Sequence, residues 1–114
     1  MVKQRKAADI YPFLEAYIAK KERQIAEIEQ VVERYEVRRS MEERAYQAMS
    51  TLRRMMSGKK PDHHMAVEYI HYVKRPMEQA RKLRLDIEEA RAILEESKPT
   101  DIITLSNVME KELD

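Results

Sequence analysis

Three residues with side chains suited to metal binding share one face of a predicted helix. His64, Glu68 and His71 are four and three residues apart, and residues at these spacings lie side by side on an α-helix. Glu68 and His71 also match the Glu-x-x-His unit of carboxylate-bridged metal sites in helical bundles. Such a site needs two of these units and further carboxylates, so a second chain would have to complete it. A metal-carboxylate helical bundle is therefore a distant alternative, and we expect exposed side chains here, with no metal or other cofactor.

Other catalytic patterns are missing from the sequence. The chain has no cysteine, which excludes disulfides and thiolate chemistry. It has one glycine, Gly58, which excludes the glycine-rich loops that bind nucleotides. No acidic residue is flanked by an apolar pocket that would shift its pKa. We therefore expect no enzyme activity and no small-molecule substrate.

Positive charge is concentrated in the middle of the chain. Residues 34–84 contain 13 basic and six acidic side chains, and the rest of the chain contains nine basic and 15 acidic ones. A basic surface would bind the phosphates of nucleic acid in a salt-dependent manner. Alternatively, long exposed helices carry charges of both signs for solubility and for i to i+4 pairing. The candidate polyanion-binding residues are Arg38, Arg39, Arg53, Arg54, Lys59, Lys60, Lys74 and Arg75.

Methionine is concentrated in the same region, since six of the eight methionines lie between residues 41 and 77. Met55 and Met56 are adjacent, so they cannot both face one helical seam. Flexible thioether side chains suit adaptable docking surfaces for proteins. The alternative is that they fill the core of an irregular hairpin end. A docking surface there would consist of Leu52, Met55, Met56 and Met65.

Two long helices are the elements that would position these residues. Apolar residues recur every three or four positions from Leu14 to Met56 and from Ala66 to Leu94, as in a coiled coil. Between them, Gly58 can adopt a left-handed conformation and Pro61 can open a helix. The pattern predicts an antiparallel helical hairpin over residues 9–98 with its turn at 57–61. Folding at Gly58 would place Arg44 beside Lys74.

Two interruptions fall inside the predicted helices. The apolar stripe disappears around Arg38–Arg44, where Ser40 and Glu43 match a capping box. The stripe resumes in phase at Tyr46, so we expect a continuous helix rather than a break at Ser40. Pro76 lies inside the second helix, where proline removes a backbone hydrogen bond. We expect a kink there, because the stripe continues beyond it.

The two ends of the chain differ in character. Residues 1–8 are basic and lack apolar periodicity, which predicts a flexible arm, followed by Asp9 as a helix cap and Pro12 in the first turn. Pro99 should stop the second helix. Residues 99–114 predict a short C-terminal helix from Asp101 to about Leu113, capped by Thr100. That helix could pack on its own hairpin or swap onto a partner.

Several apolar side chains would lie beside the seam of a single hairpin with little to cover them. They are Tyr11, Tyr17, Val31, Leu52, Met55, Tyr69 and Tyr72. Pairing two hairpins would cover them, so we expect a homodimer built as an antiparallel four-helix bundle. The sequence shows no signal peptide and no membrane-spanning run, and we expect a cytoplasmic protein without a membrane partner.

These observations favour an all-α protein that acts by binding. The leading hypothesis is a non-enzymatic adaptor or assembly protein that contacts a protein partner through its basic, methionine-rich half. The second hypothesis is a regulator that binds nucleic acid through the basic residues of 34–84.

Overall fold

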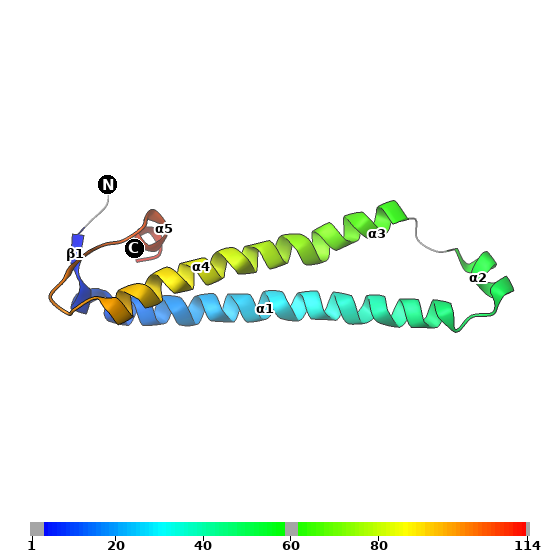
Figure 1. Cartoon of the computed structure of the whole chain (residues 1–114), viewed down its shortest axis with the longest axis horizontal. Coiled ribbons are helices and arrows are strands. Elements are labelled where there is room, and N and C mark those ends of the chain that lie inside the picture. Colours follow the sequence, from blue (N-terminus) through cyan, green and yellow to red (C-terminus); the bar gives the residue numbers. More distant parts are fainter. Residues whose placement is uncertain (1–3, 59–61, 114) are drawn as a thin grey trace. The chain divides into compact units, whose positions relative to one another are not determined.

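The computed structural model describes residues 4–58 and 62–113 and confirms an all-α helical hairpin with a short C-terminal helix (Figure 1). Part of the predicted turn, residues 59–61, lies outside the described residues. The elements in chain order are β1 (Gln4–Lys6), α1 (Ala7–Gln47), α2 (Thr51–Ser57), α3 (Asp62–Tyr69), the π-helix η1 (Ile70–Lys74), α4 (Arg75–Glu96), β2 (Ile102–Thr104) and α5 (Asn107–Leu113).

The chain divides into two compact units. The terminal unit is Met1–Gln24 with Lys82–Asp114, and the middle unit is Ile25–Arg81. In the terminal unit α1 packs against α4 in the opposite direction, since Tyr11 contacts Ser97 and Glu22 contacts Arg91. In the middle unit Tyr35 of α1 contacts Glu68 and Tyr72, and Ile28 and Met77 pack against the same cluster. Both units therefore have the antiparallel pairing expected from the sequence.

The terminal unit has the larger core. Six buried side chains meet there, from the start of α1, the end of α4, and the β2–α5 segment: Ile10, Leu14, Tyr17, Ala90, Leu105 and Met109. Leu105 and Met109 are almost fully buried, so α5 packs on its own chain. This arrangement also covers Tyr17 and leaves Tyr11 only half-exposed, although both were expected to need a partner.

Over residues 4–8 the structure differs from the flexible arm expected over residues 1–8, of which residues 1–3 lie outside the described residues. Gln4–Lys6 forms β1 and pairs antiparallel with β2, with Arg5 opposite Ile103. The first N–H groups of α1 donate to carbonyl groups beyond α4, from Ala7 to Asp101 at 2.8 Å and from Ala8 to Pro99 at 3.1 Å. These bonds supply the partners that a helix start lacks. The helix therefore begins two residues before Asp9, and Pro12 lies beyond its first turn.

The C-terminal segment also begins differently from the prediction. Residues 102–104 form β2 rather than helix, and α5 starts only at Asn107. Thr100 lies in a turn, and the Asp101 carboxylate accepts a hydrogen bond from the backbone N–H of Lys98 at 2.7 Å. The predicted end of the second helix before Pro99 is correct, because α4 stops at Glu96.

The middle unit has a much thinner core. Val32, Tyr35 and Val73 are its buried cluster, and half-buried Ile28 and Met77 pack against them. The prediction that α1 continues through Ser40 without a break is confirmed. The helix nevertheless ends at Gln47, earlier than expected, and a separate helix, α2, begins after Ser50.

A π-helical turn precedes Pro76 in the returning helix. Residues Ile70–Lys74 form η1, and the N–H of Arg75 donates to the carbonyl of Ile70, five residues back. A π turn admits one extra residue, and proline in a regular helix would clash with the carbonyl four residues back. The irregularity expected at Pro76 is therefore a π turn placed just before it.

The pairing along the hairpin differs from the one predicted by folding at Gly58. Tyr35 stacks on Tyr72, with ring centroids 5.0 Å apart, whereas symmetric folding at Gly58 would have placed it beside Leu83. The prediction that Arg44 lies beside Lys74 is therefore wrong. The early end of α1 shifts the centre of the hairpin toward the N-terminus.

Candidate docking surface

The α2 segment exposes the apolar residues predicted for docking. Leu52, Met55 and Met56 are 69%, 78% and 80% exposed, and α2 has no buried residue. Core filling by these side chains, the alternative interpretation, is thus wrong for α2. The helix is held by local polar bonds, from the N–H of Arg53 to Ser50 Oγ at 3.3 Å and from Arg54 Nε to the carbonyl of Met49 at 3.0 Å.

Met65, the fourth predicted docking residue, lies in a different environment. It is half-buried on α3 and lines a groove of about 240 Å³ with Tyr69 and Val73, opposite Tyr35 and Arg39 of α1. Tyr69 is 54% exposed. Met65 thus belongs to the side of the middle unit and not to the exposed face of α2.

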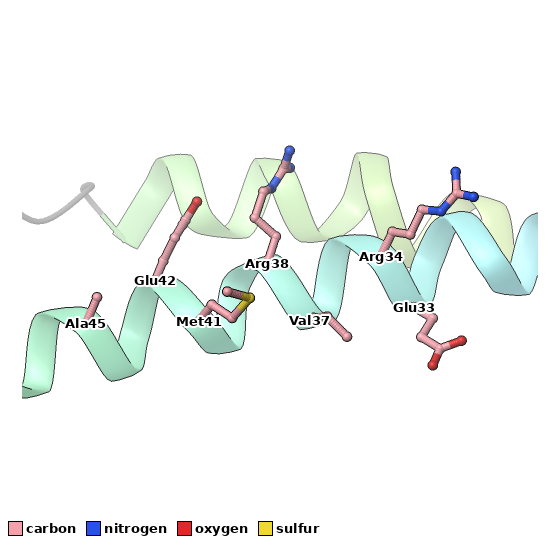
Figure 2. A pocket seen from close by; sticks show the side chains of 7 residues that line it. All are labelled: Glu33, Arg34, Val37, Arg38, Met41, Glu42 and Ala45. Carbon is pink, nitrogen blue, oxygen red and sulfur yellow. The ribbon is translucent and has the colours of Figure 1, made fainter.

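A second exposed apolar surface follows α1 within the middle unit. We call it the α1 stripe, and it consists of Arg34, Val37, Arg38, Met41 and Ala45, all drawn in Figure 2. Val37 and Met41 are 52% and 64% exposed. In Figure 2 the arginines and Glu42 project from one edge of α1 and Glu33 projects from the other. The stripe thus has an apolar centre bordered by side chains of both charges.

Arg38 lies beside a pair of stacked aromatic rings in the middle unit. The Arg38 guanidinium lies 5.5 Å from the ring centre of Tyr35, which stacks on Tyr72 at an interplanar angle of 16°. With Val31 and Arg34 these three residues line a groove of about 190 Å³. Guanidinium groups beside aromatic rings suit binding of acidic side chains or phosphates.

The structure distributes the predicted polyanion-binding residues over several elements. Arg39 Nη1 pairs with Glu42 at 2.9 Å, and Arg54 bonds to the backbone of Met49. The exposed members include Arg38 and Arg53 on α1 and α2, Lys74 at the end of η1 and Arg75 at the start of α4. Lys59 and Lys60 lie outside the described residues. The described members thus lie on four elements, α1, α2, η1 and α4, and two of them bond within the chain.

The three residues considered for metal binding have other contacts. Tyr35 donates to Glu68 Oε2 at 3.2 Å, and His71 contacts the ring of Tyr72 edge-on at 4.7 Å. His64 lies beside His63, with ring centres 6.0 Å apart. Within residues 4–58 and 62–113, no group of three histidine, aspartate or glutamate side chains is arranged to hold a metal ion.

One buried polar cluster lies in the terminal unit. Lys21 is 6% exposed, pairs with Glu112 of α5 at 2.7 Å, and lies 5.0 Å from the ring centre of Tyr17. Burial raises the pKa of the Tyr17 phenol, and the nearby carboxylates of Asp86, Glu112 and Glu89 raise it further. The ion pair between Lys21 and Glu112 links α1 to α5 within the terminal unit.

Sequence reasoning did not assign the α1 stripe to a site. Val37 and Met41 fell outside the predicted seam, and Arg34 was counted only as part of the regional charge. The available signal was their spacing, because residues 34, 37, 38, 41 and 45 recur every three or four positions along α1.

Comparisons with known proteins do not identify the chain, because no family model, curated protein or solved structure matches it. None of the described helices combines the length and apolar character needed to cross a membrane.

Proposed function

We propose that this protein is a non-enzymatic helical adaptor that binds a protein partner through the exposed apolar face of α2. The observation that carries the proposal is the exposure of Leu52, Met55 and Met56 on a helix with no buried residue. Clustered exposed apolar side chains are costly unless a partner covers them, and they commonly mark interaction sites.

The surroundings of α2 supply orientation and specificity. Arg53 is exposed beside the three apolar side chains, and charged residues at the rim of an interface mainly set association rate and partner choice. Methionine side chains adapt to partners of different shape. The expected partner surface is therefore an apolar groove with acidic residues at its rim.

A paired set of variants tests this function. Met55→Asp with Met56→Asp should weaken binding to the partner at least about 30-fold, since hot-spot residues contribute roughly 2 kcal/mol or more. Val108→Asp is a matched control, because Val108 is 50% exposed on α5. Proteins captured from the source cell by the natural chain and by the control, but not by the α2 variant, would be purified and titrated by calorimetry. Equal affinities of all three chains would refute the proposal.

The homodimer and its four-helix bundle belong to the same proposal. The middle unit leaves Val31, Tyr69 and Tyr72 exposed by 39–54%, and a second hairpin would cover side chains of this kind. We expect this dimer in the cytoplasm, which agrees with the lack of cysteine.

A nucleic-acid-binding regulator is the second candidate, favoured by exposed Arg53, Lys74 and Arg75. Binding to phosphates would fall steeply between about 50 mM and 200 mM salt. Under this hypothesis, Arg53→Glu with Arg54→Glu should abolish binding of a labelled DNA duplex. If the natural chain ignores the duplex at both salt concentrations, this candidate is excluded.

A further inference from the structure

We propose that Met55 and Met56 form a reversible oxidation site, at which hydrogen peroxide converts the two thioethers into sulfoxides and weakens docking at α2. This inference rests on the proposed function, because it names a chemical change that regulates the same apolar face. A thioether is apolar and flexible, whereas a sulfoxide is polar. The modification therefore acts directly on the property that makes α2 a docking helix.

All the sulfur of this chain is in methionine. The sequence has eight methionines and no cysteine. A cysteine thiolate, where a protein has one, is the usual first target of a peroxide. Because no thiolate competes for the oxidant within this sequence, the exposed thioethers are the sulfur groups that a peroxide meets first.

The described methionines differ widely in exposure. Met55 and Met56 are 78% and 80% exposed, which exceeds the exposure of every other large apolar side chain in the described ranges. Met41 on α1 is also exposed, at 64%, whereas Met109 in the terminal unit is fully buried. Susceptibility to oxidation follows access of the oxidant to sulfur. We therefore expect fast oxidation on α2 and slow oxidation at Met109.

Oxidation of α2 would leave the packing of the fold unchanged. The helix has no buried residue, and its polar bonds involve the Ser50 hydroxyl and the Arg54 guanidinium rather than a thioether. Met109, in contrast, packs in the same cluster as Leu14 and Leu105, where an unpaired polar oxygen would be costly. The accessible thioethers are thus on a helix that can become polar without loss of core contacts.

The reaction is an oxygen transfer that involves two electrons. A lone pair of the thioether sulfur attacks one oxygen of hydrogen peroxide, an S–O bond forms, and the O–O bond breaks. The proton of the attacked oxygen passes to the leaving oxygen, so the products are a sulfoxide and water. Sulfur is oxidised and the peroxide is reduced. Methionine sulfoxide reductases reverse the change, with two thiols supplying the electrons and forming a disulfide and water.

Graded treatment with hydrogen peroxide, followed by peptide mapping in a mass spectrometer, tests the site. Met55 and Met56 should each gain one oxygen at least about tenfold faster than Met109. Circular dichroism should show an unchanged helix content when both are converted. Incubation with dithiothreitol and the reductases for both sulfoxide epimers should remove the added oxygen.

Retention on a hydrophobic-interaction column measures the apolar face of α2 without a partner. The oxidised natural chain should elute earlier than the reduced chain. Met55→Leu with Met56→Leu keeps α2 apolar and cannot form sulfoxides there, so oxidation should shift its elution by less than half as much. Met41→Leu is the matched control, because it removes an exposed thioether outside α2 and should retain most of the shift.

Binding to the partner gives the second readout. Oxidation of the natural chain should weaken binding at least about tenfold, since apolar hot-spot residues would become polar. Reductase treatment should restore the affinity. The Met55→Leu, Met56→Leu chain should lose less than about twofold under the same peroxide treatment, because its apolar side chains are retained.

Two results would overturn the inference. One is oxidation of Met55 and Met56 no faster than that of Met109. The other is complete conversion of both residues with unchanged column retention and unchanged partner affinity. Neither result bears on the proposed function, which the unoxidised Met55→Asp, Met56→Asp chain tests. If that chain binds the partner normally, the proposed function fails, whereas fast, reversible oxidation with a shift in retention would still support the oxidation site.

Discussion

Lys21 and Tyr17 illustrate how polar groups are accommodated among buried side chains. Lys21 occupies a position of the apolar seam of α1, and the carboxylate of Glu112 compensates its charge at 2.7 Å. The Tyr17 hydroxyl is also buried, yet it has no hydrogen-bond partner among the described residues. A buried hydroxyl without a partner costs roughly 1–3 kcal/mol relative to one that is bonded.

Replacing Tyr17 and Tyr11 separately should change stability in opposite directions. Tyr17→Phe removes the unbonded hydroxyl and should raise the free energy of unfolding by about 1 kcal/mol. Tyr11→Phe removes hydrogen bonds to the Ser97 carbonyl and hydroxyl and should lower it by about 1 kcal/mol. Urea denaturation of the two variants checks both signs. A destabilised Tyr17→Phe chain would show that the hydroxyl is bonded in solution.

The pH dependence of the same variants gives a second measurement. The raised pKa of Tyr17 means that the folded chain keeps the phenol proton at a pH where the unfolded chain has lost it. The stability that the folded chain gains from the protonated phenol is fully present below about pH 10, the ordinary tyrosine pKa. It is lost as the pH rises further. Tyr17→Phe should therefore lose less stability than the natural chain between about pH 9 and pH 11.

At the scale of elements, α2 depends on local bonds instead of packing. It is seven residues long, and isolated helices of this length are marginal in water. Ser50 accepts a hydrogen bond from the N–H of Arg53, which is the usual action of a serine N-cap.

Ser50→Ala should loosen α2 without unfolding the rest of the molecule. The loss of the cap should cost about 1 kcal/mol in the local opening of residues 51–57. Hydrogen exchange followed by NMR would show faster exchange in α2 and unchanged exchange around Leu14 and Ala90. Ser40→Ala, at an exposed position inside α1, is the control. Equal acceleration throughout the chain would contradict local stabilisation.

The helices were predictable from the sequence because their apolar periodicity is local information. The α1 seam is confirmed from Leu14 to Tyr35. In the returning helix, the expected seam included Val73, Ala80 and Ile87, which are buried. Its two polar positions, Arg84 and Arg91, are exposed, and the neighbouring Leu83 and Ala90 are buried in their place. The π turn at η1 adds a residue and shifts the face of the helix that precedes it, so Ile70 is 40% exposed. A uniform repeat cannot represent that shift.

The candidate site was predictable only in part for a related reason. Residue type singled out Met55 and Met56, but exposure depends on where α1 ends, and no proline or glycine marks residues 48–50. Predicting the α1 stripe requires knowledge of which face of α1 is buried. Pairing of β1 with β2 joins segments about 100 residues apart, and three-residue strands leave no alternating pattern to recognise.

At the scale of the whole molecule, the buried apolar side chains are unevenly divided. The terminal unit buries Leu14, Leu105 and Met109 almost completely. The middle unit buries Ala80 completely, but its larger buried side chains, Ile25, Val32, Tyr35 and Val73, are each 6–9% exposed. Resistance to unfolding should therefore depend mainly on the segment that returns as β2 and α5.

Truncating one side chain of this segment should destabilise the molecule strongly. Leu105→Ala should lower the free energy of unfolding by about 2–4 kcal/mol, the usual cost of a cavity at a fully buried leucine. Val108→Ala, at a half-exposed position of the following helix, should change it by less than about 0.5 kcal/mol. Urea denaturation monitored by circular dichroism would compare the two. A small effect of Leu105→Ala would mean that the C-terminal segment adds little to stability.

The link between β1 and β2 has a consequence for biosynthesis. The middle unit is a continuous stretch, Ile25–Arg81, so a ribosome releases all of it before the terminal unit can close. The start of α1 must wait for Leu105 and Met109 to be translated, and closing so large a loop is slow compared with local helix pairing. The nascent chain thus carries a finished but thin-cored hairpin while Ile10, Leu14 and Tyr17 remain uncovered, and chaperones have their best opportunity to bind during that interval.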